Sequence, residues 1–163
     1  MKKILLALLF VAPLALAGLV RAQTAQAQPT SAEEYYANAQ QLAAQAEIAY
    51  PQPFLDLPLW DSAVSNAQAA ADLAPTDFKY LRYAAELYTT TQWWIRAYDT
   101  WKLYEAKTAL DDAAKTQAAK SAAKLGYLAL QRGAKTEAVM SLEASLKWKE
   151  DPSARALLVR AKR

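Results

Sequence analysis

The strongest constraint on this chain is a spacing that recurs along it. Trp60 and Trp94 are 34 residues apart, and so are Ala63 and Ala97. Ala138 follows Ala97 after 41 residues, which is the same period plus seven, and seven residues are close to two helical turns. Because a helix lengthened by two turns keeps its buried face in phase, the spacing predicts three similar helical units in succession.

The stretch Phe78–Tyr104 shows what one unit contains, and it holds nine aromatic residues. At helical spacing its apolar residues form two faces, Leu81, Ala84, Ala85 and Tyr88 on a first helix and Trp94, Ala97, Trp101 and Tyr104 on a second. The polar run 89–92 between the two faces predicts a tight turn. The stretch is therefore expected to form a helical hairpin with small residues where the helices cross.

Similar hairpins are expected on both sides of this stretch. The helices expected upstream are 32–48 and 60–73, and those expected downstream are 113–132 and a helix through Ala138, Leu142 and Ser145, after a turn at Gly133. Asp151 is expected to cap a final helix that begins at Pro152. Such a helix would close the apolar end of the last unit.

This pattern of period, small crossing residues and a proline after the unit resembles the tetratricopeptide repeat (TPR) family. The residues that carry the resemblance are Leu81, Ala84, Ala85, Tyr88, Ala97, Trp101 and Tyr104 in the middle unit, with Tyr35, Asn38, Ala39 and Leu42 in the first. The resemblance covers about Ala32 to Glu150. It implies an all-α fold, a right-handed αα-superhelical solenoid of three TPR-like helical hairpins plus a C-terminal capping helix.

Residues 1–27 have the features of a secretory signal peptide. Two lysines precede the uncharged stretch 4–20, and Ala-x-Ala cleavage sites follow at 15–17 and 25–27. A retained membrane anchor is the alternative, although the uncharged stretch is shorter than the ~20 residues that a spanning helix usually needs. The mature repeat domain is expected at 28–163, in the periplasm or cell envelope of a bacterium, with membrane contact only if the leader is retained.

Charge is divided unevenly along the mature chain. The formal charge of +3 comes from the leader, since residues 28–163 contain 16 basic and 16 acidic residues. Residues 28–78 hold seven acids and no Lys or Arg, whereas residues 79–163 hold 16 basic and nine acidic residues. The neutral sum argues against nucleic-acid binding. The division is explained by charges on solvated helix faces, by head-to-tail association, or by docking of the basic end on an acidic partner or anionic lipid.

The composition argues against catalysis and against metal or cofactor binding. The chain contains no Cys, no His and only three Gly, which removes thiol chemistry, the usual general base and a glycine-rich phosphate loop. Ser121 and Lys124 match the Ser-x-x-Lys pair of serine acyl-transfer enzymes, but the companion motifs are absent. We therefore expect a non-enzymatic protein with no cofactor and no metal.

A proline-rich insertion at 48–59 is the main departure from the repeat. Its prolines oppose helix, and its apolar content is too high for a solvated loop. Two interpretations are open: a lid that folds back over the first unit, or an element that contacts a partner or another copy. The insertion contacts are expected to be Tyr50, Pro51, Pro53 and Phe54.

The resemblance also implies a binding face, because the first helices of TPR units line a concave groove. By position in the repeat, the groove residues would be Tyr36, Gln40, Lys79, Arg82, Glu86, Lys120, Tyr127 and Gln131. These charges favour an extended peptide of mixed charge or a partner subunit. The expected function is that of an interaction adaptor or scaffold in the cell envelope. The alternative is a structural component that self-associates through head-to-tail acidic and basic contacts.

Overall fold

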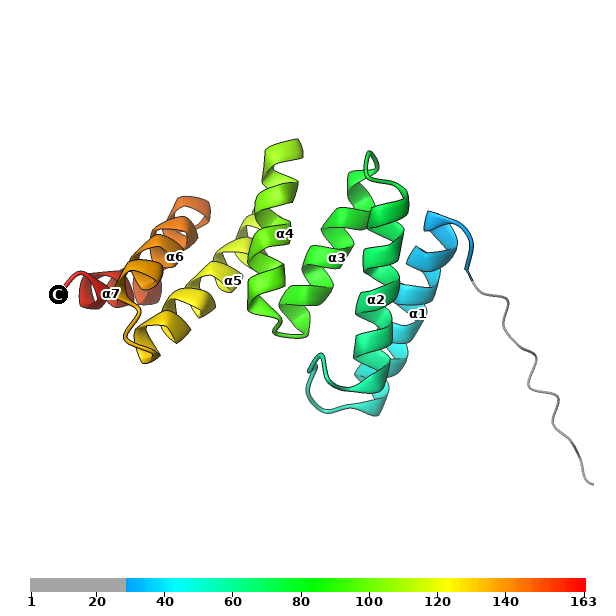
Figure 1. Ribbon diagram of the computed structural model, residues 1–163, viewed down its shortest axis with the longest axis horizontal. Helices are drawn as coiled ribbons and strands as arrows, with labels where there is room; N and C mark the ends of the chain where they lie inside the picture. Colours follow the sequence, from blue (N-terminus) through cyan, green and yellow to red (C-terminus); the bar gives the residue numbers. More distant parts are fainter. Residues whose placement is uncertain (1–28) are drawn as a thin grey trace, which may run out of the picture.

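The computed structural model describes residues 29–163, so the predicted signal peptide lies outside the described residues. Within this range the chain forms seven α-helices and no strand. The helices are α1 (Ala32–Ala49), α2 (Pro58–Leu73), α3 (Phe78–Thr90), α4 (Trp94–Lys107), α5 (Asp112–Gln131), α6 (Lys135–Trp148) and α7 (Pro152–Ala161). Figure 1 shows them following one another along the long axis, from α1 near one end to α7 at the other. The predicted all-α class is confirmed.

Most helices begin at residues that the sequence marks as caps. Ser31 and Glu34 form a reciprocal capping box at the start of α1. Asp77, Asp111 and Asp151 each accept a hydrogen bond from a backbone N–H in the first turn of α3, α5 and α7. Proline occupies the first position of α2 and of α7, where its missing N–H removes no intrahelical bond.

The turns after α3 and α5 have the same geometry. Gln92 and Gly133 both adopt positive φ, 62° and 74°. In each turn the next residue donates its N–H to a carbonyl five residues back, Trp93 to Tyr88 and Ala134 to Ala129, both at 2.9 Å. These bonds define Schellman caps, which close a helix with a left-handed residue. The turn predicted at Gly133 is confirmed.

Consecutive helices pack against each other along the chain. The most extensive contacts are α1 with α2 and α5 with α6, followed by α3 with α4; α3 also touches α5, and α5 touches α7. One core cluster joins α1 through α5 with Trp148, and a second joins α5, α6 and α7.

The small residues predicted at the helix crossings are buried. Ala63, Ala97 and Ala138 are each 0% exposed, and so is Ala85. At the α5–α6 crossing, a Cβ built on Gly126 would stand 2.5 Å from Cγ of Leu142, which is itself fully buried. Only glycine permits that approach. The buried faces of the hairpins therefore follow the spacing in the sequence.

Two element boundaries differ from the sequence prediction. Thr89 and Thr90 were assigned to a turn but belong to α3, because Thr89 bonds the Ala85 carbonyl at 2.8 Å and is fully buried. The insertion is also shorter than predicted, since α1 continues to Ala49 and α2 begins at Pro58. Only residues 50–57 are non-helical, because a proline at the first helical position starts a helix instead of breaking it.

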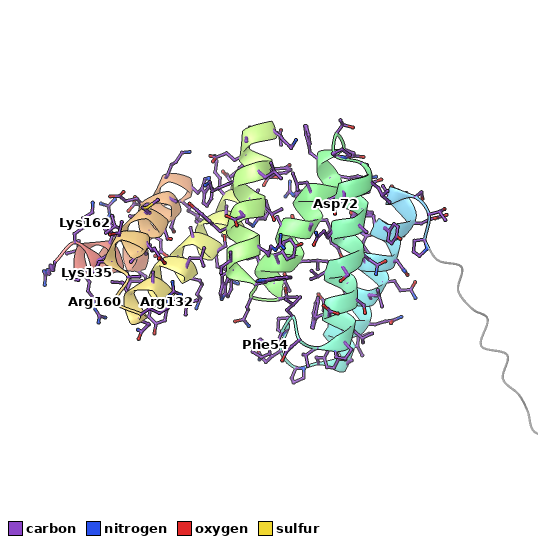
Figure 2. All side chains as sticks on the ribbon, in the orientation of Figure 1. Phe54, Asp72, Arg132, Lys135, Arg160 and Lys162 are labelled. Carbon is purple, nitrogen blue, oxygen red and sulfur yellow. The ribbon has the colours of Figure 1, made fainter. Side chains whose placement is uncertain are left out.

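The uneven charge of the sequence is spread along the long axis. Figure 2 shows Arg132, Lys135, Arg160 and Lys162 near the α6–α7 end, and Asp72 on α2 in the other half of the molecule. Residues 29–78, which include α1 and α2, contain acidic residues but no Lys or Arg. The excess of basic residues lies in α3–α7 and the segments between them. The two ends of the row therefore carry opposite charge.

Candidate functional site

Four of the predicted groove residues, Tyr36, Lys79, Arg82 and Glu86, form contacts with other residues of the fold. Lys79 on α3 pairs with Glu33 on α1 at 2.8 Å, and the Tyr80 hydroxyl donates to the same carboxylate at 2.7 Å. These two hydrogen bonds, from Lys79 first, hold the pKa of Glu33 below its usual range. The Tyr36 ring packs edge-on against Tyr80 and Tyr83, with centroids 5.4 and 5.0 Å away. Tyr36 and Lys79 thus join α1 to α3.

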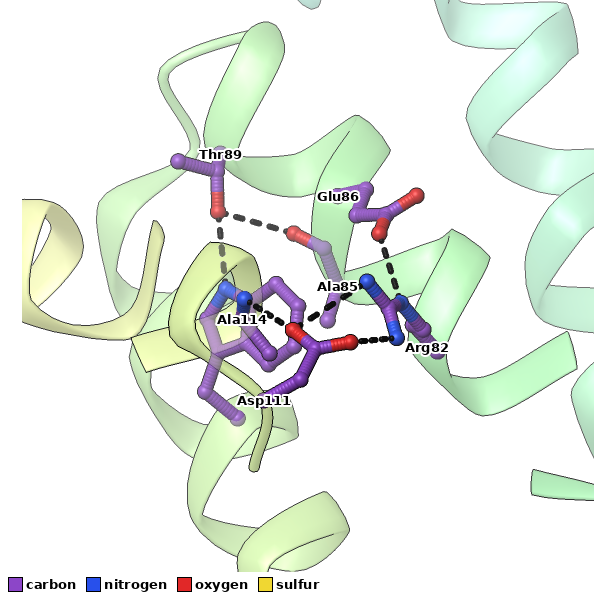
Figure 3. A network of polar contacts seen from close by, with 7 residues as sticks. Arg82, Ala85, Glu86, Thr89, Asp111 and Ala114 are labelled. Atoms are coloured by element: carbon purple, nitrogen blue, oxygen red, sulfur yellow. Dashed lines mark hydrogen bonds and ion pairs between the residues drawn. The ribbon is translucent and has the colours of Figure 1, made fainter. Parts of the chain in front are cut away.

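Arg82 and Glu86 are likewise occupied within the fold, as Figure 3 shows. The Arg82 guanidinium donates to Glu86 at 2.9 Å and to Asp111 at 2.6 Å. Asp111 also accepts the backbone N–H of Ala114 at 2.8 Å, so one carboxylate caps α5 and ties it to α3. The hydrogen bond from Ala114 and the neighbouring Arg82 lower the pKa of Asp111. Glu86 and Asp111 raise the pKa of Arg82, which stays protonated.

Two further hydrogen bonds lie in the core of the α3–α4 hairpin. The Trp101 indole N–H donates to the Thr89 hydroxyl at 3.0 Å, and both side chains are fully buried. The Thr89 hydroxyl in turn donates a hydrogen bond to the Ala85 carbonyl at 2.8 Å (Figure 3). Burial raises the pKa of Tyr83, which packs against Tyr36 of α1, to about 12. This region therefore has a structural function, joining α3, α4 and α5.

A cavity of about 590 Å³ lies between α5, the end of α6 and the start of α7. We call it the α5–α7 cavity. Its floor is apolar, with Ala119, Ala123 and Leu157 among the lining residues. Lys120, Lys124 and Tyr127 line it from α5, and Tyr127 is 43% exposed. Two of the predicted groove residues, Lys120 and Tyr127, are therefore brought together here.

The charges around the α5–α7 cavity are not balanced. Within residues 29–163, neither Lys120 nor Lys124 forms an ion pair. The acids on the rim are already engaged, because Glu150 pairs with Arg155 at 2.6 Å and Asp151 caps α7. Lys149 donates to Thr116 at 2.8 Å. The cavity thus offers an apolar floor beside two ammonium groups that lack a counter-ion in the described chain.

The remaining predicted groove residues lie away from this cavity. Gln40 is exposed on α1, and Gln131 is exposed at the end of α5, outside the cavity lining. Sequence reasoning also missed Leu157 and Lys149, which reach the cavity from α7 and from the end of α6. The available signal was the half-apolar face of the last helix, which was interpreted only as a cap.

The insertion residues divide into a packed set and an exposed set. Tyr50, Leu55, Leu57 and Leu59 pack against the core. Pro51 is exposed, Pro53 is half-buried and Phe54 is 45% exposed. Apart from Leu59, which belongs to α2, both sets lie in the loop 50–57, so this loop packs in part against the core and leaves the Phe54 ring at the surface.

The Ser-x-x-Lys pair has no shared surface in the fold. Ser121 is fully buried and donates to the Ala118 carbonyl at 2.7 Å, whereas Lys124 is exposed. In the described part of the chain, no group of three or more acidic side chains is placed to hold a metal ion. None of the described helices combines the length and apolarity that crossing a membrane requires.

Comparison with known proteins leaves the α5–α7 cavity as the main guide to function. No protein-family model matches this chain. A search of curated proteins gives no significant match.

Proposed function

We propose that this chain is a non-enzymatic interaction adaptor or scaffold that binds an extended peptide segment, or an exposed segment of a partner subunit, in the α5–α7 cavity. The observation that carries the proposal is the pairing of an apolar floor with Lys120 and Lys124, which have no ion-pair partner in residues 29–163. Its volume, about 590 Å³, lies in the range of ligand pockets, ~300–1,000 Å³. The ligand segment would place apolar side chains on the floor and carboxylates near the lysines.

The proposed architecture is a right-handed αα-superhelical solenoid of three TPR-like hairpins, α1–α2, α3–α4 and α5–α6, with α7 as the capping helix. Two observations support a repeat. Ala63, Ala97 and Ala138 hold matching positions and are all fully buried. The Schellman turns at Gln92 and Gly133 are also 41 residues apart, like Ala97 and Ala138. In such an array the face formed by α5 and α7 belongs to the concave side.

The proposed location is the bacterial periplasm or cell envelope, after removal of residues 1–27. This part of the proposal rests on the two lysines, the uncharged stretch and the Ala-x-Ala sites of the sequence. N-terminal sequencing of the protein recovered from envelope fractions tests it, with Gln23 or Gln28 expected as the first residue. Recovery of an intact Met1 in the membrane fraction would contradict removal of the leader.

A peptide-binding experiment tests the function itself. Arrays of synthetic peptides that vary in acidic, basic and apolar content are probed with the chain 28–163, and binding of the selected peptides is measured by fluorescence anisotropy. Peptides that combine Asp or Glu with apolar residues are expected to bind best. Lys120→Glu with Lys124→Glu should weaken their binding at least tenfold.

The matched control is Lys102→Glu with Lys135→Glu. Both lysines are exposed, have no ion pair in the described residues and lie outside the α5–α7 cavity, and the charge change is the same. The control should retain binding. Equal losses in both double variants would show that net charge, not this cavity, determines binding.

A further inference from the structure

A second cavity, unrelated to the α5–α7 cavity, lies beside the insertion loop. It has a volume of about 820 Å³ and is lined by the loop, the first turns of α2 and the turn between α3 and α4. We call it the strap groove. It shares no lining residue with the α5–α7 cavity. The proposed peptide site therefore does not account for it.

The walls of the strap groove combine aromatic rings with carboxylates. Phe54, which is 45% exposed, and the half-buried Trp94 supply the rings. Asp56 and Asp61 supply the carboxylates, and both side chains are exposed. No basic residue lines the groove, and neither Asp forms an ion pair in the chain from 29 to 163.

These walls select the chemistry of an occupant. Residues 29–78, which form α1, the loop and α2, contain seven acids and no Lys or Arg, so no near neighbour in sequence offsets the two carboxylates. Carboxylates beside aromatic faces suit a guanidinium or ammonium group, which pairs with the acid and stacks on the ring. An apolar neighbour in the occupant would cover the exposed part of Phe54.

The outward face of α7 has this composition. Ala156, Val159 and Arg160 are spaced by three and four residues from Ala156, which places them on one side of the helix, and Arg163 follows the end of α7. All four are exposed, and Val159 is 51% exposed. Arg160 and Arg163 form no ion pair in residues 29–163, whereas Lys162 is held by Glu143 at 2.7 Å.

This face cannot reach the strap groove of its own chain. Figure 1 shows α7 at the far end of the row from α1 and α2, whose connection forms the groove wall. Figure 2 likewise shows Arg160 at one end and Phe54 beside the other half of the molecule. Any contact between the two surfaces must therefore join two molecules.

We propose that the strap groove of one molecule receives the outward face of α7 from a second copy of this chain. Arg160 and Arg163 of the second copy pair with Asp56 and Asp61, and Val159 covers Phe54. Because the two surfaces differ and lie apart on each molecule, the contact is heterologous and joins molecules head to tail. The opposite charge of the two ends supports the same direction of assembly.

Light scattering and sedimentation of the chain 28–163 test this proposal. The average mass should rise with protein concentration and fall when NaCl is raised from about 0.05 M to about 0.5 M, because salt screens exposed charges. A chain that is monomeric at all concentrations and at both salt levels would overturn the proposal, and binding of an arginine peptide to that monomer would assign the groove to a different partner.

Single substitutions locate the contact. Asp61→Lys should weaken self-association at least tenfold, while Asp72→Lys should leave it unchanged. The two variants match, since both acids are exposed on α2, neither has an ion pair within 29–163, and Asp72 lies outside the groove. Equal effects of both substitutions, or no effect of Asp61→Lys, would contradict the assigned surface. Arg160→Gln with Arg163→Gln should give the same loss from the other side, in a helix whose fold circular dichroism can verify.

Charge exchange gives the decisive result. A variant with Asp56→Lys and Asp61→Lys carries two basic surfaces, and a variant with Arg160→Glu and Arg163→Glu carries two acidic ones. Each alone should be monomeric, and an equimolar mixture should associate again, because each basic surface then meets an acidic one. A mixture that stays monomeric, with both variants folded, would overturn the proposal.

Discussion

Gln92 and Gly133 occupy the same position in two turns, 41 residues apart, and both adopt left-handed backbone geometry. In each turn the residue that follows donates its N–H to the carbonyl five residues before it. Glycine adopts this conformation without a steric cost, whereas an L-residue pays about 1–2 kcal/mol for it. The repeated geometry is thus built with the favourable residue in one turn and an unfavourable one in the other.

Exchanging the residue types of these turns should shift stability in opposite directions. Gly133→Ala should lower the free energy of unfolding by about 1 kcal/mol, and Gln92→Gly should raise it by about 0.5–1 kcal/mol. Urea denaturation followed by circular dichroism measures both. A destabilising Gln92→Gly would show that this side chain contributes more to the fold than its backbone geometry costs.

Because α5 and α6 lie close together at Gly126, even the addition of one methyl group there should lower the free energy of unfolding. Gly126→Ala should destabilise the protein by about 1–3 kcal/mol despite the better helix propensity of Ala, because its Cβ would meet the fully buried Leu142. In a Leu142→Ala background the same change should cost almost nothing, since the clash is gone. Additive effects in this double-mutant cycle, measured by urea denaturation, would contradict the crossing.

The ionisation of Asp111 should make the stability of the fold depend on pH in the acidic range. Its pKa is lowered in the folded chain by the Ala114 N–H and by Arg82, from an ordinary value of 3.8. Its contribution is therefore complete above about pH 3.8 and is lost as the pH falls through the lower folded pKa. Thermal melts of the wild type and of Asp111→Asn between about pH 6 and pH 3 test this, because Asn can still cap α5 but cannot titrate.

The melting temperature of Asp111→Asn should lie below that of the wild type at pH 6, and the gap should narrow toward pH 3. Other carboxylates, including Glu33 and Glu34, titrate in the same direction in both proteins, so the difference isolates Asp111. A gap that stays constant with pH would show that the charge of Asp111 does not stabilise the fold.

Substitutions of two apolar residues in the insertion loop should differ in their effect on stability. Leu57 packs against the core, so Leu57→Ala should lower the free energy of unfolding by about 1–2 kcal/mol. Phe54 is 45% exposed, and Phe54→Ser should change stability by less than about 0.5 kcal/mol. Thermal melts at low protein concentration, where self-association does not contribute, compare the two. Equal losses would mean that the whole loop is a lid.

The sequence predicted the helices well because their signals are local. Ser31, Asp111 and Asp151 cap the helices that they precede, and Pro152 is the first residue of α7. The burial of the repeated alanines was predicted from their spacing alone. Thr89 was assigned to a turn because threonine has weak helix propensity, but a buried hydrogen bond from Trp101 outweighs that preference.

The candidate site was predicted only in part, because pairing between distant residues has no local signal. Lys79 meets Glu33 from 46 residues away, and Arg82 meets Asp111 from 29 residues away. Both basic residues join α3 to a neighbouring part of the chain, Lys79 to α1 and Arg82 to the residue that caps α5. Lys120 lies over the Trp94 ring and lines the α5–α7 cavity, and it forms no ion pair within residues 29–163.

A two-dimensional NMR titration of the ¹⁵N-labelled chain 28–163 with the best peptide from the array tests the central claim most directly. If the chain is an adaptor that binds through the α5–α7 cavity, the amide shifts should change most at Lys120, Lys124, Tyr127 and Leu157. These changes should disappear in Lys120→Glu with Lys124→Glu. Shifts that concentrate on α1 and α3 instead, around Tyr36 and Lys79, would contradict the assignment of the site.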